Sequence, residues 1–524
     1  MLSLLKVPKN YALLWALFFT ILIYLFEEWV FAQLQGKYLK GLQPALDAPY
    51  LIGLLSSCLA FMLVVIGVWL SLMASPTFKV IYGLFFSAMI LGQYGYWQAL
   101  NRFAAVSDLQ VALASPPDLW FTAIGLFFNR YSLIPICIYL LLLYTFRHEN
   151  LTHWREFGAF GITIIILVLT IRHLPLQINK GISITQFVYT TIELTSAQTK
   201  IINRIALPTL TIRPPVKNII LIVDESIRSD HLSLNHYSRP TTPYLQELSA
   251  QGHLYNWGTA SSGATCSPLS NAMLMTGLMS DPHILEAIYE QPTVFQYAKA
   301  LGYKTTYIDA QTNHLWNGLQ VSDLRYVDNW LKSTDLGSGI DRDLNAADYI
   351  AQLVKTEGNF IMLNKKGVHF LYEDSYPPEQ LIWGPLPSNY YKQPELAVNP
   401  YDNGIVYNVD LFFRHLLPDN NIAPNNWYIY TSDHGQTLFE GGESWLHCNF
   451  TKREAAVPLF IIGHLPTAPD TTYNASHSNI LPTILDLMEF PEPITGHSLL
   501  SPKPLKQTKR YFYSGNLDKV AFDE

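Results

Sequence analysis

The first third of the chain contains five apolar stretches that are nearly free of charged residues. They cover residues 11–31, 51–73, 81–100, 132–146 and 157–171. Most of them approach the roughly 20 residues that a membrane-spanning helix needs. The sequence therefore predicts a transmembrane domain of about five helices over residues 1–175. The last two stretches are short, and a buried helical hairpin is the alternative for that pair.

Lysine and arginine residues in the short connections predict how these helices are oriented. Five of them lie in connections that the alternation of spans places on one side: Lys6, Lys9, Lys79, Arg147 and Arg155. The positive-inside rule makes that side the cytoplasmic one. With an odd number of spans, the rest of the chain is exported. We expect residues 176–215 to form a bridging helical linker and residues 216–524 to form the exported domain.

Composition narrows the possible functions of the exported domain. The net charge is −7, and no run of Lys or Arg would follow a phosphate backbone, so nucleic-acid binding is not expected. Of the four cysteines, Cys58 and Cys137 lie in apolar stretches. Cys266 and Cys448 are therefore the only pair in the polar region that can form a disulfide, and two unrelated buried thiols are the alternative.

Short β-branched runs that end in polar residues recur along the exported part. They are NIILIVDES (218–226), NFIMLNKKG (359–367) and NWYIYTSDHG (426–435), with helical patterns such as TVFQYAKALG (293–302) between them. This alternation predicts a mainly parallel sheet that is covered by helices on both faces. In such sheets, ligands bind at the carboxyl ends of the strands.

Acids and histidines stand at these predicted strand ends. Asp224 and Glu225 end the first run, and Asp433 and His434 end the last. Each pair alone is more typical of a helix cap. Together, carboxylates and a neutral imidazole are the ligands of a zinc-type ion that keeps one position open for the reacting group.

Residues 260–278, ASSGATCSPLSNAMLMTGL, run from a turn of small residues into a helical pattern. Thr265, Cys266 and Ser267 stand together at this junction. A hydroxyl there would lie at a helix N-terminus, which attracts anions, and a nearby metal would turn it into a nucleophile. A Ser or Thr helix cap is the structural alternative.

Two long segments carry a resemblance to a known family. IVDESIRSDHLSLNHYSRPTTPYL (222–245) and SDHGQTLFEGGESWLH (432–447) resemble the opening and closing motifs of the membrane-bound phosphoethanolamine transferases. These enzymes belong to the alkaline phosphatase and sulfatase superfamily. The resemblance covers nearly the whole chain, because the five-helix anchor and the exported domain also match the family's layout.

The resemblance implies a fold, a metal and a reaction. The fold is an alkaline-phosphatase-like α/β/α domain in the periplasm, tethered to the bacterial inner membrane and expected to be monomeric. The metal is zinc, bound by Glu225, Thr265, Asp433 and His434, and the phosphate group is contacted by His369 and His447. The nucleophile, a threonine, takes phosphoethanolamine from phosphatidylethanolamine and passes it to lipid A, to a lipopolysaccharide core sugar or to a glycan.

Thr265 matches the family's nucleophile in residue type and in its distance from the turn, so it is the predicted nucleophile and Ser267 is its rival. Cys266 lacks the Cys-x-Pro-x-Arg frame of a sulfatase. The chain departs from the family's pattern at two places near the expected site. The Ser-Val-Pro-Cys run that usually follows the nucleophile is missing, and Asn364 and Lys365 replace a His-Gln pair before the Gly-x-His segment. A phosphoglycerol transferase acting on envelope glucans and a catalytically dead lipid-binding relative are the alternative functions.

Overall fold

The computed structural model divides the chain into two compact units, Met1–Lys200 and Ile201–Glu524. It describes residues 11–35, 61–62, 64–100, 103–104, 128–147, 183–184, 187, 203–208, 210 and 214–523, except for 314–317, 338, 386–395, 439, 441–445, 466, 493–494, 502–504 and 516. The predicted helix over 157–171 and most of the predicted linker lie outside these residues.

The first unit contains the helices α1 (Ala12–Gln35), α3 (Pro76–Leu100) and α6 (Leu133–Thr145). Their shared core includes Phe19, Phe86 and Tyr139, whose rings contact one another with centroids 4.2–5.9 Å apart. Among the described residues, no helix is both long enough and apolar enough to cross a membrane. The five-helix transmembrane domain therefore stays a prediction.

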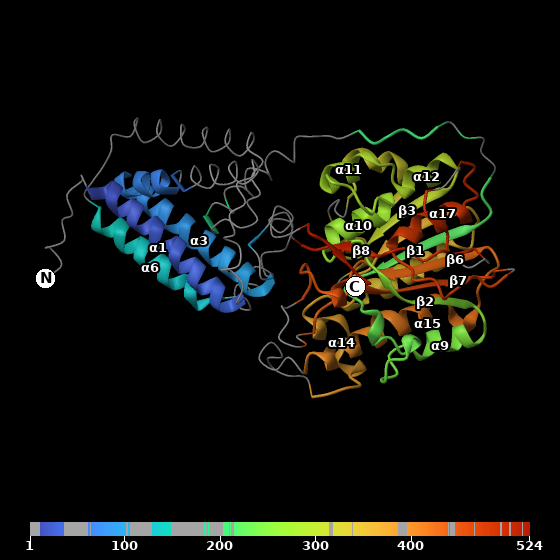
Figure 1. The fold of residues 1–524 in the computed structure, drawn as a ribbon. Helices are drawn as coiled ribbons and strands as arrows, with labels where there is room; N and C mark the ends of the chain where they lie inside the picture. The colour runs from blue at the N-terminus through green and yellow to red at the C-terminus, as the bar shows by residue number, and fades with distance from the viewer. Residues whose placement is uncertain are drawn as a thin grey trace. The chain divides into compact units, whose positions relative to one another are not determined.

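The second unit is built on a seven-stranded sheet in the order β2-β7-β6-β1-β5-β3-β4 (Figure 1). The strands are β1 (Asn218–Asp224), β2 (Leu254–Ser261), β3 (Lys304–Asp309), β4 (Asn329–Leu331), β5 (Asn359–Asn364), β6 (Asn426–Ser432) and β7 (Ala456–Ile462). All neighbouring pairs are parallel except those that β7 makes with β2 and β6. The predicted mainly parallel sheet is confirmed, and the three predicted strands are β1, β5 and β6.

Helices cover both faces of this sheet. Figure 1 shows α10, α11, α12 and α17 on one side and α9, α14 and α15 on the other. Their bounds are α9 (Pro243–Ala250), α10 (Ser267–Thr276), α11 (Ile284–Glu290), α12 (Val294–Ala300), α13 (Arg342–Leu353), α14 (Val398–Ile405), α15 (Phe412–Leu416), α16 (Lys452–Ala455) and α17 (Ile480–Leu487). A small hairpin of β8 (Tyr511–Tyr513) and β9 (Lys519–Ala521) completes the unit.

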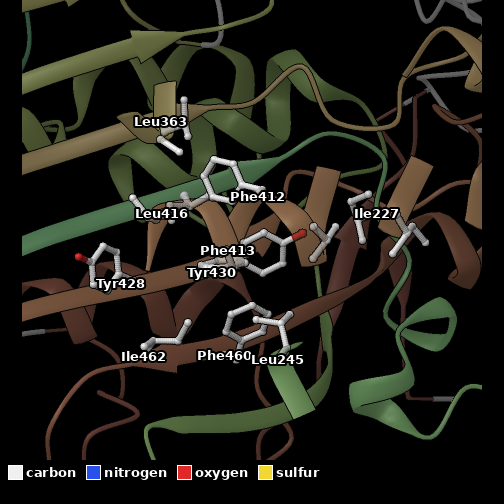
Figure 2. Packing of buried hydrophobic residues seen from close by; sticks show 14 of the residues in the cluster. Ile227, Leu245, Leu363, Phe412, Phe413, Leu416, Tyr428, Tyr430, Phe460 and Ile462 are labelled. Atoms are coloured by element: carbon white, nitrogen blue, oxygen red, sulfur yellow. The ribbon is translucent and has the colours of Figure 1, made fainter. Parts of the chain in front are cut away.

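The central strand β1 carries apolar side chains on both faces of the sheet. Every one of its residues is buried, and successive side chains of a strand point to opposite faces. Ile220 and Ile222 pack in one core with α9, α13 and α15, whereas Ile219, Leu221 and Val223 pack in the other with α12 and α17. Figure 2 shows part of the first core, in which the rings of Tyr430 and Phe460 stack with centroids 4.5 Å apart.

Candidate metal and nucleophile site

The carboxyl ends of β1 and β6 bring the predicted acids and histidine together. The two strands are parallel neighbours, with Asp224 paired to Ser432, so Glu225 follows one strand at the same edge where Asp433 and His434 follow the other. The backbone amide of Asp433 donates to the carbonyl of Asp224 at 2.9 Å. The sheet therefore places these side chains by its register.

The ligand atoms of this group converge. His434 Nε2 lies 3.5 Å from Glu225 Oε1 and 3.5 Å from Asp433 Oδ2. Ligand atoms of Glu225, His434 and His447 all lie within 4.8 Å of one another. The side chains of Glu225, Asp433 and His434 are buried, and that of His447 is half-buried. His447, which was predicted to contact phosphate, thus lies next to the metal-ligand candidates.

Hydrogen bonds orient both imidazoles. His434 Nδ1 donates to the carbonyl of Gly435 at 2.7 Å, and His447 Nδ1 donates to Gln436 Oε1 at 2.9 Å. Such a second contact fixes the tautomer of a metal-ligating histidine and leaves Nε2 to act as the ligand. Burial also lowers the pKa of His434, which favours the neutral, metal-binding form.

The charge balance of the site fits a divalent cation. Burial, together with the negative charge of Glu225, raises the pKa of Asp433 well above its usual range. Two carboxylates that approach each other out of water need a positive charge to stay ionised. Oxygen and imidazole donors in this number are those that zinc prefers. The predicted ligands Glu225, Asp433 and His434 are brought together, and they fit zinc.

The predicted ligand and nucleophile Thr265 does not reach this cluster. Its hydroxyl is buried and donates to the carbonyl of Asn449 at 2.7 Å. Ser267 instead lies beside the ligands: its Oγ is 2.9 Å from His434 Nε2 and 3.3 Å from Glu225 Oε2. Ser267 is the first residue of α10, so its side chain stands at a helix N-terminus. The geometry favours Ser267 over Thr265.

The third candidate at this junction, Cys266, is bonded to Cys448. This disulfide ties the loop before Ser267 to the residue after His447, and the amide of Cys448 donates to the carbonyl of Thr265 at 2.8 Å. The disulfide that the sequence left open is therefore present in the structure. It joins the two loops that supply the nucleophile candidate and the second histidine.

Helix α10 is itself fastened to the metal-ligand candidates. The Ser270 hydroxyl donates to the carbonyl of Asp433, and Asn271 Nδ2 donates to Asp433 Oδ2 at 3.4 Å. The first turn of this helix therefore keeps a fixed position relative to Asp433. Ser267 begins the same helix, one turn before Asn271, so its position relative to Asp433 is fixed as well.

His369 lies at the rim of the site. Its side chain is exposed, and its ring centroid is 6.3 Å from that of His447. The ring Nδ1 donates to the carbonyl of Phe370 at 2.6 Å. Its predicted role as a phosphate contact stays a prediction.

Two polar residues of the site were not singled out by the sequence patterns. Gln311 Nε2 donates to Glu225 Oε2 at 3.0 Å and to the carbonyl of Lys365 at 2.8 Å. Gln436 holds His447, as described above. Gln311 follows the end of β3, so the rule that ligands collect at strand ends would have found it. Gln436 lies inside the closing motif.

Comparisons with known proteins bear on this site. A family model described as Sulfatase matches residues 217–490, just over half of the chain. Phosphoethanolamine transferase EptC of Escherichia coli (strain K12) is 26% identical over 238 residues, which are 43% of this chain and 40% of that protein. Phosphatidylethanolamine transferase Mcr-1 of Escherichia coli is 25% identical over 303 residues, 52% of this chain and 53% of that protein. The chain thus spans about two fifths to one half of the length of these relatives.

Two solved structures share the fold. The C-terminal periplasmic domain of EptC from Escherichia coli in complex with Zn superposes with a TM-score of 0.51 at 19% identity, over 61% of this chain and 97% of that one. The integral membrane protein lipooligosaccharide phosphoethanolamine transferase A from Neisseria meningitidis superposes with a TM-score of 0.61 at 18% identity, over 92% and 95%. The resemblance drawn from the two motifs is confirmed.

Proposed function

Because the chain belongs to the sulfatase family, we propose that it is a zinc-dependent transferase that moves phosphoethanolamine from phosphatidylethanolamine to an acceptor of the cell envelope. The observation that carries the proposal is the position of Ser267, whose hydroxyl lies between His434 and Glu225 at the start of α10. The relatives named above, which are called phosphoethanolamine and phosphatidylethanolamine transferases, support the choice of donor.

The proposed reaction has two displacements at phosphorus. In the first, Ser267 Oγ attacks the phosphorus of phosphatidylethanolamine, the bond to diacylglycerol breaks, and diacylglycerol takes up the proton that the serine gives up. In the second, an acceptor hydroxyl oxygen attacks the same phosphorus, the bond between Ser267 Oγ and phosphorus breaks, and Ser267 takes up the proton that the acceptor gives up. The phosphoryl group carries negative charge in both displacements. The N-terminus of α10 stabilises such a charge electrostatically.

In this proposal, each residue of the site has its own role. Glu225, Asp433 and His434, with His447 beside them, would hold a zinc ion, which when bound lowers the pKa of a neighbouring hydroxyl and offsets phosphate charge. Gln436 orients His447. The exposed ring of His369 is placed to exchange a proton with the leaving or attacking oxygen. The disulfide of Cys266 and Cys448 supports a periplasmic location, because disulfides persist in oxidising compartments.

We expect the donor headgroup to be ethanolamine rather than glycerol. The full chain, reconstituted in vesicles that contain either phosphatidylethanolamine or phosphatidylglycerol, should release diacylglycerol at least about tenfold faster from the first, a difference of about 1.4 kcal/mol. Chromatographic measurement of diacylglycerol checks this. Faster release from phosphatidylglycerol would assign the chain to the phosphoglycerol transferases, and release from neither would leave only a lipid-binding role.

A further inference from the structure

A buried lysine pairs with the residue that precedes the metal-ligand candidate Glu225. Lys365 follows β5, and its backbone amide donates to the carbonyl of Val223 at 2.9 Å. Its side chain has no exposed surface. The ammonium group donates to Asp224 Oδ2 at 2.6 Å and to the carbonyl of Asn408, and it lies 4.2 Å from the ring centre of Phe412. Phe412 belongs to the core shown in Figure 2.

Asp224, the partner of this lysine, is the residue before Glu225. Its Oδ1 accepts the backbone amide of Glu225 at 2.9 Å. Its Oδ2 accepts from Lys365 and from the Tyr430 hydroxyl at 2.8 Å. The carboxylate therefore holds the backbone of a metal-ligand candidate with one oxygen and contacts a cation with the other.

A second buried carboxylate completes the surroundings of the lysine. Asp343 Oδ2 lies 3.9 Å from Lys365 Nζ. Its two oxygens accept the backbone amides of Lys366 and Gly367 at 2.8 and 3.0 Å. Gly367 has a φ of 56°, and a Cβ there would come within 2.4 Å of Asp224 Oδ1. The turn after Lys365 is thus folded tightly against the carboxylate of Asp224.

These contacts place one positive charge between two buried carboxylates. A buried charge is stable only beside a partner of opposite sign, so Asp224 and Asp343 need the positive charge of Lys365. In a two-metal centre, a second cation lies about 3.5–4 Å from the first, and Asp224, the residue before Glu225, is the buried carboxylate closest in sequence that could serve it. Here the lysine ammonium already takes that carboxylate.

We propose that Lys365 is the built-in second cation of this centre, which makes Asp224 a positioning residue for Glu225 and limits the centre to one metal ion. The inference rests on the zinc site of the proposed function. It assigns different roles to two adjacent acids: Glu225 binds the metal, whereas Asp224 binds the backbone of Glu225 and the lysine.

Zinc binding by the chain of residues 1–524 tests this assignment. The double variant Asp224→Asn with Lys365→Met replaces the ion pair by a neutral pair and avoids leaving either charge buried alone. Lys366→Met is the matched control, because it removes a lysine charge from the next residue, whose Nζ donates to the carbonyl of Asp374 at 2.8 Å. Glu225→Gln is the ligand variant. Zinc retained on a chelating resin is counted per chain, and affinity is measured by chelator competition.

We expect the wild type and Lys366→Met to retain one zinc ion per chain with equal affinity. The double variant should also retain one ion, with affinity lowered 10-fold to 100-fold, as is usual when a group that orients a ligand is lost. Glu225→Gln should retain less than a tenth of an ion. Circular dichroism and thermal unfolding establish that each variant is folded.

Three results would overturn the inference: two retained ions in the wild type, no retained ion in the double variant, or unchanged affinity in the double variant. The first shows room for a second metal, the second makes Asp224 a ligand, and the third removes its positioning role. None of these measurements uses the transfer reaction. A wild-type chain that binds one zinc ion but transfers nothing would contradict only the proposed function.

Discussion

Ser267→Ala is expected to lower kcat for transfer by about 1000-fold or more, because it removes the only hydroxyl of the junction that lies beside the metal-ligand candidates. Thr265→Val is the matched control. It removes the hydroxyl that donates to Asn449 and keeps the β-branched shape. Its kcat should stay within about tenfold of the wild-type value, because a buried hydrogen bond of this kind is worth about 1 kcal/mol.

The two variants are compared in detergent with phosphatidylethanolamine as donor, and diacylglycerol release is followed over time. Thermal unfolding of both proteins separates a catalytic loss from a loss of fold. The reverse order, with Thr265→Val inactive and Ser267→Ala active, would return the role to Thr265. Equal loss in both would indicate that the junction matters for structure more than for chemistry.

His434→Gln is expected to produce the second large effect. This imidazole touches Ser267 and lies 3.5 Å from both carboxylates, so its loss should lower zinc affinity and kcat by at least about 100-fold each. His415→Gln is the control, since that ring is exposed on α15 and pairs with Asp348 at 2.8 Å. Element analysis of the purified chains gives the zinc content.

Full zinc content in His434→Gln would show that the ion, if bound, lies elsewhere. Loss of zinc with an unchanged kcat would show that the transfer reaction does not need the metal. The account requires that both quantities fall together in this variant and that both stay unchanged in His415→Gln.

The sheet and most of the site were predictable from sequence for one physical reason. Strands that are buried on both faces appear as continuous apolar runs, and β1, β5 and β6 are such runs. Their carboxyl ends meet at one edge, so Glu225, Asp433 and His434 were expected to meet there. Strand pattern and ligand chemistry predict that acids and a histidine meet at this edge, whereas the choice of Glu225 over Asp224 as the ligand came from the family resemblance.

The nucleophile could not be placed in the same way. Thr265 and Ser267 are two residues apart, and the choice between them depends on which residue begins α10. Helix ends fray, and their limits are uncertain by about one or two residues even when the coordinates are known. Here Cys266 precedes the helix and Ser267 begins it. The turn before it points Thr265 toward Asn449 instead.

Lys365 illustrates a different limit. The sequence shows a lysine after a strand, and lysine is usually exposed. Its burial depends on Asp224 at the end of β1 and on Asn408 and Phe412, which lie one helical turn apart in another segment of the chain. Only the assembled fold brings these partners to one place, so neither the ion pair nor its link to the backbone of Glu225 through Asp224 has a local signature.

Localising the covalent intermediate tests the central claim most directly. The full chain is incubated with phosphatidylethanolamine and zinc without an acceptor, quenched in acid, digested and analysed by fragmentation mass spectrometry. The account predicts that phosphoethanolamine is attached to Ser267. Attachment to Thr265, or a digest in which neither residue is modified while diacylglycerol is released, would contradict it.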